Sequence, residues 1–210
     1  MKVLITGSSK GIGKQIVDLF NINGHDVYGP NRNEIDLSKD FKLNRTDFDI
    51  VINNAGINPL NTIEDMDQEL VMKVNYYSPL KIIQQCLPYM VSQNFGSIVN
   101  IGSIWSNISK EKRAAYSASK SALESLARSI TSEYGKFGIL ANTVSPGFIL
   151  TDLTRQNNTE DQIKELERNI PLNKLGTVND VADLIYFLAT KNSYITGQNI
   201  IIDGGYSCVA

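Results

Sequence analysis

The chain has 210 residues, of which 42% are hydrophobic and 20% charged, as in ordinary globular proteins and unlike disordered ones. Its 20 Lys and Arg residues nearly balance its 22 Asp and Glu residues. The overall charge therefore gives no reason to expect nucleic acid or an anionic membrane as a partner. The length suits one α/β domain over residues 1–210, with a substantial core.

We expect no targeting segment, membrane span or metal site. The first seven residues already resemble a strand and a turn, which leaves no room for a signal peptide. No apolar run approaches the ~20 residues of a membrane-spanning helix. Cys86 and Cys208 have neither metal-ligand spacing nor a disulfide pattern, which favours two reduced thiols in a cytoplasmic protein. His25 is the only histidine, so a catalytic triad built on histidine is excluded.

A glycine-rich turn joins the first predicted strand to the first predicted helix. Lys2 to Thr6 is a short apolar run typical of a buried parallel strand, and an apolar helical stripe begins at Ile12. Between them, Gly7, Gly11 and Gly13 allow a sharp turn and let a pyrophosphate approach the N–H groups at a helix start. The order of strand, turn and helix favours dinucleotide binding over the alternative of a plain loop.

The end of the second predicted strand, Asp26 to Gly29, bears on the choice of cofactor. A site for NAD usually has an acidic residue near this point, which binds the ribose 2′-hydroxyl. Here Asn31 and Arg32 follow the strand, and Lys10 lies in the glycine turn. Two cations without a carboxylate suit a 2′-phosphate, which favours NADP(H). The alternative is that both cations are merely solvated.

The following segment is unusually short. Glu34 to Leu37 resembles a very short third strand, and only eleven residues, Ser38 to Phe48, separate it from the strand Asp49 to Asn53. A full crossover usually needs a dozen or more residues. Any helix here is therefore truncated or absent, and we expect this edge of the sheet to be thin and poorly covered.

Glu64 to Val91 resembles one long helix that is broken by Pro79. Proline has no N–H to donate to the carbonyl four residues earlier, which belongs to Asn75. We therefore expect the Asn75 carbonyl to be free for water or another donor. A harmless kink is the alternative.

The strongest candidate for chemistry lies in a predicted helix, Ala114 to Tyr134. Tyr116 and Lys120 are one turn apart and project from the same face. A cation beside a phenol lowers its pKa from about 10, and such a tyrosine can exchange a proton with a carbonyl oxygen. Chance spacing on an exposed helix is the alternative. Ser103 follows the strand Ser97 to Ile101 and supplies a nearby hydroxyl.

The last third of the chain contains two further predicted strands, Gly138 to Val144 and Asn199 to Ile202. Thr159 and Thr177 each precede an amphipathic helix as a predicted N-cap. The helix after Thr159 is either a lid over an active site or an ordinary packed helix.

Together these residues resemble the short-chain dehydrogenase/reductase family in its single-domain form. The matching segments are Thr6 to Gly13, Asn53 to Gly56, Pro146 to Thr151 and Ile195 to Gly205. Four residues fall on the catalytic tetrad of the family: Asn75, Ser103, Tyr116 and Lys120. The resemblance implies an α/β fold, namely a single doubly wound Rossmann domain with a mostly parallel seven-stranded sheet that is shortened around strand 3.

The resemblance also implies a role for each matching residue. Tyr116 would be the general acid in reduction and the base in oxidation, and Ser103 would orient the substrate oxygen. Lys120 would lower the Tyr116 pKa and hold the nicotinamide ribose, and Asn75 would keep a water for the proton relay. The residues implied to bind the cofactor are Gly7, Ser9, Lys10, Gly11, Ile12, Gly13, Asn31, Arg32, Asp36, Leu37, Asn53, Ala55, Gly56, Tyr116, Lys120, Pro146, Gly147, Ile149 and Thr151.

The implied activity is that of an NADP(H)-dependent oxidoreductase, with NAD(H) as the second candidate cofactor, that interconverts a carbonyl and a secondary alcohol by hydride transfer. The alternative is a catalytically idle NADP(H)-binding regulator or scaffold, which the intact tetrad disfavours. Family members commonly pair through their two long helices, which implies a homotetramer or homodimer.

Within the family, Ile170 to Gly176 resembles the 3-oxoacyl-carrier-protein reductase type. A thioester-linked acyl chain is therefore one candidate substrate beside other small carbonyl compounds. Two features depart from that type. The segment from Pro30 to Phe48 is short, and Phe137 stands where such reductases often have an arginine, although Lys174 keeps positive charge nearby.

Overall fold

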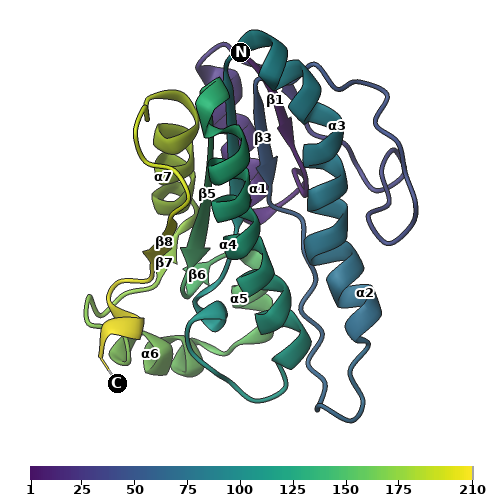
Figure 1. Cartoon of the computed structure of the whole chain (residues 1–210). Helices are drawn as coiled ribbons and strands as arrows, with labels where there is room; N and C mark the ends of the chain where they lie inside the picture. Colours follow the sequence, from purple (N-terminus) through teal and green to yellow (C-terminus); the bar gives the residue numbers. More distant parts are fainter. Residues whose placement is uncertain (210) are drawn as a thin grey trace.

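The computed structural model describes residues 1–209 and contains a parallel six-stranded sheet between two layers of helices (Figure 1). The strand order is β2-β1-β3-β4-β5-β8. Strands β2 and β3 lie on opposite sides of β1, so the direction in which the chain adds strands reverses there. In such sheets ligands bind at this point of reversal, beyond the carboxyl ends of the strands. The strands are β1 Lys2–Ile5, β2 Asp26–Tyr28, β3 Ile50–Asn53, β4 Gly96–Ile101, β5 Ile139–Pro146 and β8 Asn199–Ile202, and β6 Ile149–Leu150 pairs separately with β7 Gly176–Thr177.

Helices cover both faces of the sheet and the carboxyl ends of its strands. In chain order they are α1 Gly11–Ile22, α2 Gln68–Met72, α3 Ser78–Gln93, α4 Ala114–Tyr134, α5 Asp152–Asn157, α6 Glu160–Arg168 and α7 Val178–Thr190. Shorter turns are the π-helical η1 Lys73–Tyr77 and the 3-10 helices η2 Ile104–Ser106, η3 Gly135–Phe137 and η4 Tyr206–Cys208. Helices α3 and α4 pack on one face and α1 and α7 on the other. Helices α5 and α6 lie below the strands in Figure 1.

The strand predicted over Glu34 to Leu37 does not form, so the prediction of a seventh strand is wrong for the described residues. Short polar side chains fold this stretch into turns instead. The Asn31 Oδ1 accepts a hydrogen bond from the Asn33 N–H at 2.9 Å, and the Asp36 Oδ1 accepts one from the Ser38 N–H at 3.0 Å. Such bonds give the backbone an alternative to pairing in a sheet.

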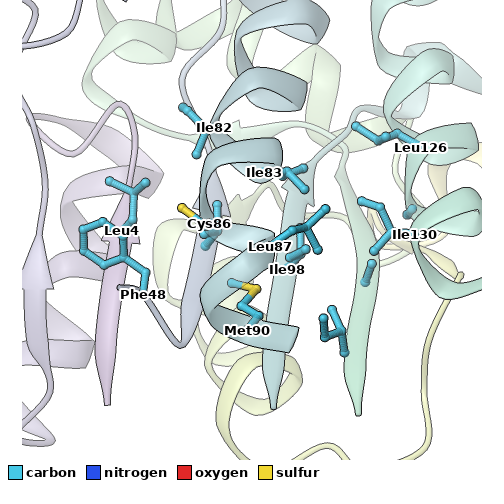
Figure 2. Close-up of a cluster of buried hydrophobic side chains, with 14 of the residues drawn as sticks. Leu4, Phe48, Ile82, Ile83, Cys86, Leu87, Met90, Ile98, Leu126 and Ile130 are labelled. Atoms are coloured by element: carbon cyan, nitrogen blue, oxygen red, sulfur yellow. The ribbon is translucent and has the colours of Figure 1, made fainter. Parts of the chain in front are cut away.

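Residues 38–48 contain no helix, as predicted, but the expectation of poor cover is wrong. Leu43 and Phe48 are buried in the same core cluster as Leu4, and Figure 2 shows Phe48 beside Leu4. The rings of Phe48 and Tyr28 stack with their centroids 5.9 Å apart. The Leu43 N–H donates to the Gln85 Oε1 at 2.9 Å, which ties the loop to α3. Apolar side chains of a loop thus do the covering that a crossover helix usually does.

The helix predicted from Glu64 begins instead at Gln68, because Asp67 caps it by accepting a hydrogen bond from the Leu70 N–H at 2.9 Å. It changes to the π-helical turn η1 and continues as α3. Pro79 lies in the first turn of α3, where a missing N–H costs least. Asn75 lies within η1, and single π-helical turns frequently mark functional sites.

Other local predictions are confirmed. Helix α4 and strand β8 have the predicted bounds, and both Thr159 and Thr177 cap their helices through a complete capping box. Cys86 and Cys208 are free thiols. Within residues 1–209, no helix combines the length and apolar character that crossing a bilayer requires.

Candidate active site

Three glycines of the turn between β1 and α1 leave backbone uncovered at its surface. Gly7 and Gly11 have φ angles of +66° and +55°, which side chains rarely tolerate. A Cβ on Gly13 would lie 2.0 Å from the Gly7 carbonyl oxygen. The Asn54 Nδ2 donates to the carbonyl oxygens of Thr6 at 3.1 Å and Gly7 at 3.0 Å and so fixes the turn. Asn54 was not among the predicted site residues, because its hydrogen bonds join the end of β3 to the end of β1, two segments far apart in the sequence.

Two adjoining hollows follow the carboxyl ends of β1 and β3. The first has a volume of about 450 Å³ and the second about 320 Å³, and they share Gly7, Ser9, Ala55 and Gly56. The predicted cofactor residues that line the first alone are Asn31, Arg32, Asp36 and Leu37, and those that line the second alone are Lys10, Gly11, Ile12, Gly13 and Thr151. An elongated groove with a glycine turn at its centre fits an adenine dinucleotide, whose pyrophosphate needs close approach to backbone N–H groups.

The outer end of the groove contains a carboxylate as well as cations. The Asp36 Oδ2 lies 3.7 Å from the Arg32 Nε and 3.9 Å from the Lys39 Nζ. Hydrogen bonds from Ser38 lower the pKa of Asp36, so this carboxylate is charged at neutral pH. The sequence predicts two cations and no carboxylate at this end of the site, but the folded chain also places the Asp36 carboxylate beside Arg32.

Beside the groove, next to Gly56, Lys120 and Tyr116 lie together as their spacing predicts. The Lys120 Nζ is 5.6 Å from the centroid of the Tyr116 ring and donates to the Ile101 carbonyl oxygen at 2.6 Å. Lys120 is 3% exposed, and its burial lowers the pKa of the ammonium to about 8. Ser103 is buried and hydrogen-bonded to the Tyr116 side chain.

The pKa of Tyr116 moves in the direction opposite to the prediction. Burial raises the pKa of the phenol, and the hydrogen bond from Ser103 and the positive charge of Arg113 lower it only in part. Burial disfavours the phenolate because the charged form loses its hydration. The predicted effect of Lys120 is thus not the dominant one, and the phenol is neutral and able to donate its proton.

Asn75 connects the proton-transfer residues to the groove. Its Nδ2 donates to the Ile57 carbonyl oxygen at 2.9 Å and to the Ser119 Oγ at 3.0 Å, and Ser119 donates to the Tyr116 carbonyl oxygen at 2.7 Å. A Cβ on Gly56 would lie 3.3 Å from the Asn75 Oδ1 and 3.5 Å from the Lys120 Nζ. All four members of the predicted tetrad therefore gather beside a groove residue, although their roles stay predictions.

Six predicted cofactor residues do not line the groove, namely Tyr116 and Lys120, which lie beside it, and Asn53, Pro146, Gly147 and Ile149. Asn53 is 2% exposed and donates to the Asn100 Oδ1 at 2.9 Å, because successive strand residues point to opposite sides and Asn54 takes the groove side. Pro146 is buried in β5, and Ile149 packs into the core beneath α1 and α7. A Cβ on Gly147 would lie 2.6 Å from the Asp203 Cβ, so Gly147 permits a close crossing of two loops.

The buried Lys120 predicts stability that rises with pH. Its pKa of about 8 in the folded protein is below its ordinary 10.5, so between these values the unfolded chain holds a proton that the folded chain has lost. The free energy of unfolding should gain up to ~1.4 kcal/mol per pH unit from this group above pH 8. Urea unfolding between pH 7 and about pH 10 measures this gain. Above about pH 10 the raised pKa of Tyr116 has the opposite effect and lowers the free energy of unfolding as the pH rises.

The Lys120→Met variant is the control, because it removes the titrating group and keeps most of the buried volume. It should lose the rise above pH 8. An equal rise in both proteins would contradict the assignment to Lys120.

Known proteins resemble the chain over nearly its whole length. The family model described as "Enoyl-(Acyl carrier protein) reductase" matches residues 36–207. The 3-oxoacyl-[acyl-carrier-protein] reductase FabG of Buchnera aphidicola is 33% identical over 96% of this chain and 95% of its own length. These matches favour an enzyme over an idle binding protein.

Three solved structures, each 28% identical in sequence to this chain, share its fold. A short chain dehydrogenase/reductase family protein has a TM-score of 0.89 and covers 99% of this chain and 97% of its own. A 4-hydroxyisoleucine dehydrogenase complexed with NADH has a TM-score of 0.87 and covers 100% and 99%. A protein described as ElxO with NADP bound has a TM-score of 0.85 and covers 99% of both chains.

Proposed function

Because the chain belongs to the short-chain dehydrogenase/reductase family, we propose that it interconverts a carbonyl compound and a secondary alcohol with NADP(H) as the hydride carrier. The enzyme is an oxidoreductase that uses NAD(P)(H). One observation carries the finer proposal. The half-buried phenol of Tyr116 meets the buried hydroxyl of Ser103 and the buried amine of Lys120 beside a groove whose glycine turn leaves room for a pyrophosphate.

Tyr116 acts as the general acid in reduction and as the base in oxidation. Burial keeps its phenol protonated, which suits donation to a carbonyl oxygen that gains negative charge. Ser103 is hydrogen-bonded to the same side chain and orients the substrate oxygen toward it. The nicotinamide, when bound, supplies or accepts the hydride, and the protein supplies position and the proton.

Lys120 and Asn75 support this proton transfer. The Lys120 ammonium has three donors and uses one on the Ile101 carbonyl oxygen, which leaves two for the nicotinamide ribose. Asn75 holds the segment after β3 against α4 through its bonds to Ile57 and Ser119. We assign it a positioning role in the proton relay.

The groove favours NADP(H) over NAD(H) because Arg32 and Lys10 are exposed at positions that can reach a 2′-phosphate. Arg32→Gln should lower the preference for NADPH by about 10- to 100-fold, since a charge-assisted hydrogen bond contributes about 1.5–3 kcal/mol. The ratio of kcat/KM for NADPH to kcat/KM for NADH measures this preference.

Two further variants make the cofactor test specific. Arg128→Gln removes an exposed arginine from α4 and should leave the ratio unchanged. Asp36→Asn removes the carboxylate beside Arg32 and should raise the ratio, because a 2′-phosphate then meets less repulsion. An Arg32→Gln ratio equal to that of wild type would overturn the assignment.

The substrate is a small carbonyl compound or its alcohol, and a thioester-linked acyl chain is a candidate because the curated relative is a 3-oxoacyl-carrier-protein reductase. We further propose a cytoplasmic homotetramer or homodimer that pairs through the α2–α3 and α4 helices. Tyr77, in the turn η1 between α2 and α3, leaves apolar surface exposed, which supports pairing there. A monomer in sedimentation at micromolar concentration would contradict it.

The proposed activity is tested by following loss of NADPH absorbance with a panel of 3-oxoacyl thioesters, simple ketones and oxo acids. Turnover of at least one class supports the proposal. Tight NADPH binding without turnover of any class would contradict it.

A further inference from the structure

Arg113 lies near the proton-transfer residues in both sequence and structure. It is the N-cap residue of α4, three positions before Tyr116, and its charge acts on the Tyr116 phenol. Its Cζ is 5.3 Å from the centroid of the Trp105 ring. Trp105 in turn follows Ser103 by two residues and donates its backbone N–H to the Ser103 Oγ at 3.3 Å. The guanidinium is therefore held on the face of a residue whose backbone contacts Ser103, and its charge reaches the Tyr116 phenol.

One donor of this guanidinium, the Nε, is buried and has no hydrogen-bond partner in the protein. Among the side chains that the structure describes, Arg113 also forms no ion pair within 4.0 Å. A buried donor without a partner costs about 1–3 kcal/mol, and native proteins usually retain one only for a ligand, a water or an ion.

The surroundings of Arg113 favour an anion at this point. Lys110 places its Nζ 5.5 Å from the centroid of the same Trp105 ring, so two cations share one indole. Phe148 and Tyr206 extend the aromatic surface, with ring centroids 6.1 and 6.5 Å from that of Trp105. Lys110, Phe148 and Tyr206 also line a hollow of about 320 Å³ against α6, together with the carboxylate of Glu165. Arg113 and Lys110 thus place two positive charges on this aromatic surface, which favours an anion there.

We propose that Arg113 binds a carboxylate of the substrate, so that the enzyme acts on oxo acids and the corresponding hydroxy acids in preference to neutral ketones. This inference rests on the proposed function, because it places the reacting carbonyl at Tyr116. An arginine offers a rigid, planar fork of donors that matches a carboxylate in two parallel hydrogen bonds. The Trp105 face orients the guanidinium before the substrate arrives, which reduces the entropy lost on binding.

The sharpest test compares oxo acids with their methyl esters. The series consists of 3-oxo, 4-oxo and 5-oxo acids, which vary the separation of carbonyl and carboxylate, and each is matched with its neutral ester. The wild-type enzyme should favour the best acid over its ester by at least about 10-fold in kcat/KM. Arg113→Gln should remove most of this ratio, and Arg113→Lys should restore part of it.

The acid-to-ester ratio separates recognition from an effect on the phenol. Arg113 also lowers the Tyr116 pKa, so its loss shifts the pH profile, but acid and ester share that shift and the ratio cancels it. Arg128→Gln is the matched control and should leave the ratio at the wild-type value. Equal losses for acids and esters in Arg113→Gln would overturn the carboxylate site and leave the proposed function standing.

Trp105 provides a readout that needs no turnover, because it is the only tryptophan of the chain. Titration of the NADP⁺ complex with the oxo acid should give a saturable change in its emission that the ester does not produce and that Arg113→Gln abolishes. If no carbonyl compound is reduced but this change is observed, the carboxylate site stands and the proposed function fails. No saturable change in the wild-type protein would overturn the site.

Discussion

Replacing Tyr116 with phenylalanine is expected to lower kcat by about 10³-fold, because general acid–base catalysis commonly contributes 10²- to 10⁴-fold. The variant keeps the ring that lies 5.6 Å from the Lys120 Nζ and removes only the hydroxyl that bonds with Ser103. NADPH affinity should therefore stay within a few-fold of wild type. Steady-state turnover together with NADPH fluorescence titration measures both quantities.

Tyr134→Phe is the matched control, since it removes a phenolic hydroxyl from the last residue of the same helix. It should retain wild-type kcat. Undiminished turnover by Tyr116→Phe would contradict the proton-transfer role, whereas loss of NADPH binding by that variant would indicate a structural role instead.

Replacing Gly13 with alanine is expected to be the most damaging change in the groove. The new Cβ would lie 2.0 Å from the Gly7 carbonyl oxygen and 2.4 Å from the Asn54 Nδ2. The turn must move, which should lower the free energy of unfolding by about 1–3 kcal/mol and weaken NADPH binding by at least 10-fold. Urea unfolding and NADPH titration test the two effects separately.

Gly135→Ala is the control for this substitution, because nothing lies within 4 Å of a Cβ at that position and its φ of −57° suits alanine. It should leave stability and NADPH affinity within error of wild type. A Gly13→Ala variant with wild-type affinity would show that the cofactor does not approach this turn.

The features that were predictable from the sequence are those fixed by local contacts. Helix α4 follows from its own residues, and the caps at Thr159 and Thr177 are formed by side chains three residues apart. The helical spacing of Tyr116 and Lys120 fixes their approach, although not the environment around them.

The features that were missed depend on contacts between distant segments. Asp36 and Ser38 hold a turn where the apolar pattern indicates a strand, and Phe48 covers the sheet through contacts with Leu4 and Tyr28. The pKa of Tyr116 depends on how deeply its phenol is buried, which spacing along a helix does not reveal.

Arg113 was missed for the same reason as Asn54. Its importance comes from Trp105, a residue in a different element, and from a buried Nε that no pattern of residues marks. An arginine three residues before Tyr116 looks like an ordinary solvated residue at a helix start.

The most direct test of the central claim is a crystal structure of the protein with NADP⁺. The account predicts that the pyrophosphate contacts the backbone between Gly7 and Gly13, and that the nicotinamide ring lies within a few ångströms of the Tyr116 hydroxyl. It also predicts that Lys120 contacts the adjoining ribose. A cofactor bound outside this groove, or side chains of Tyr116 and Lys120 that face away from the nicotinamide, would contradict it.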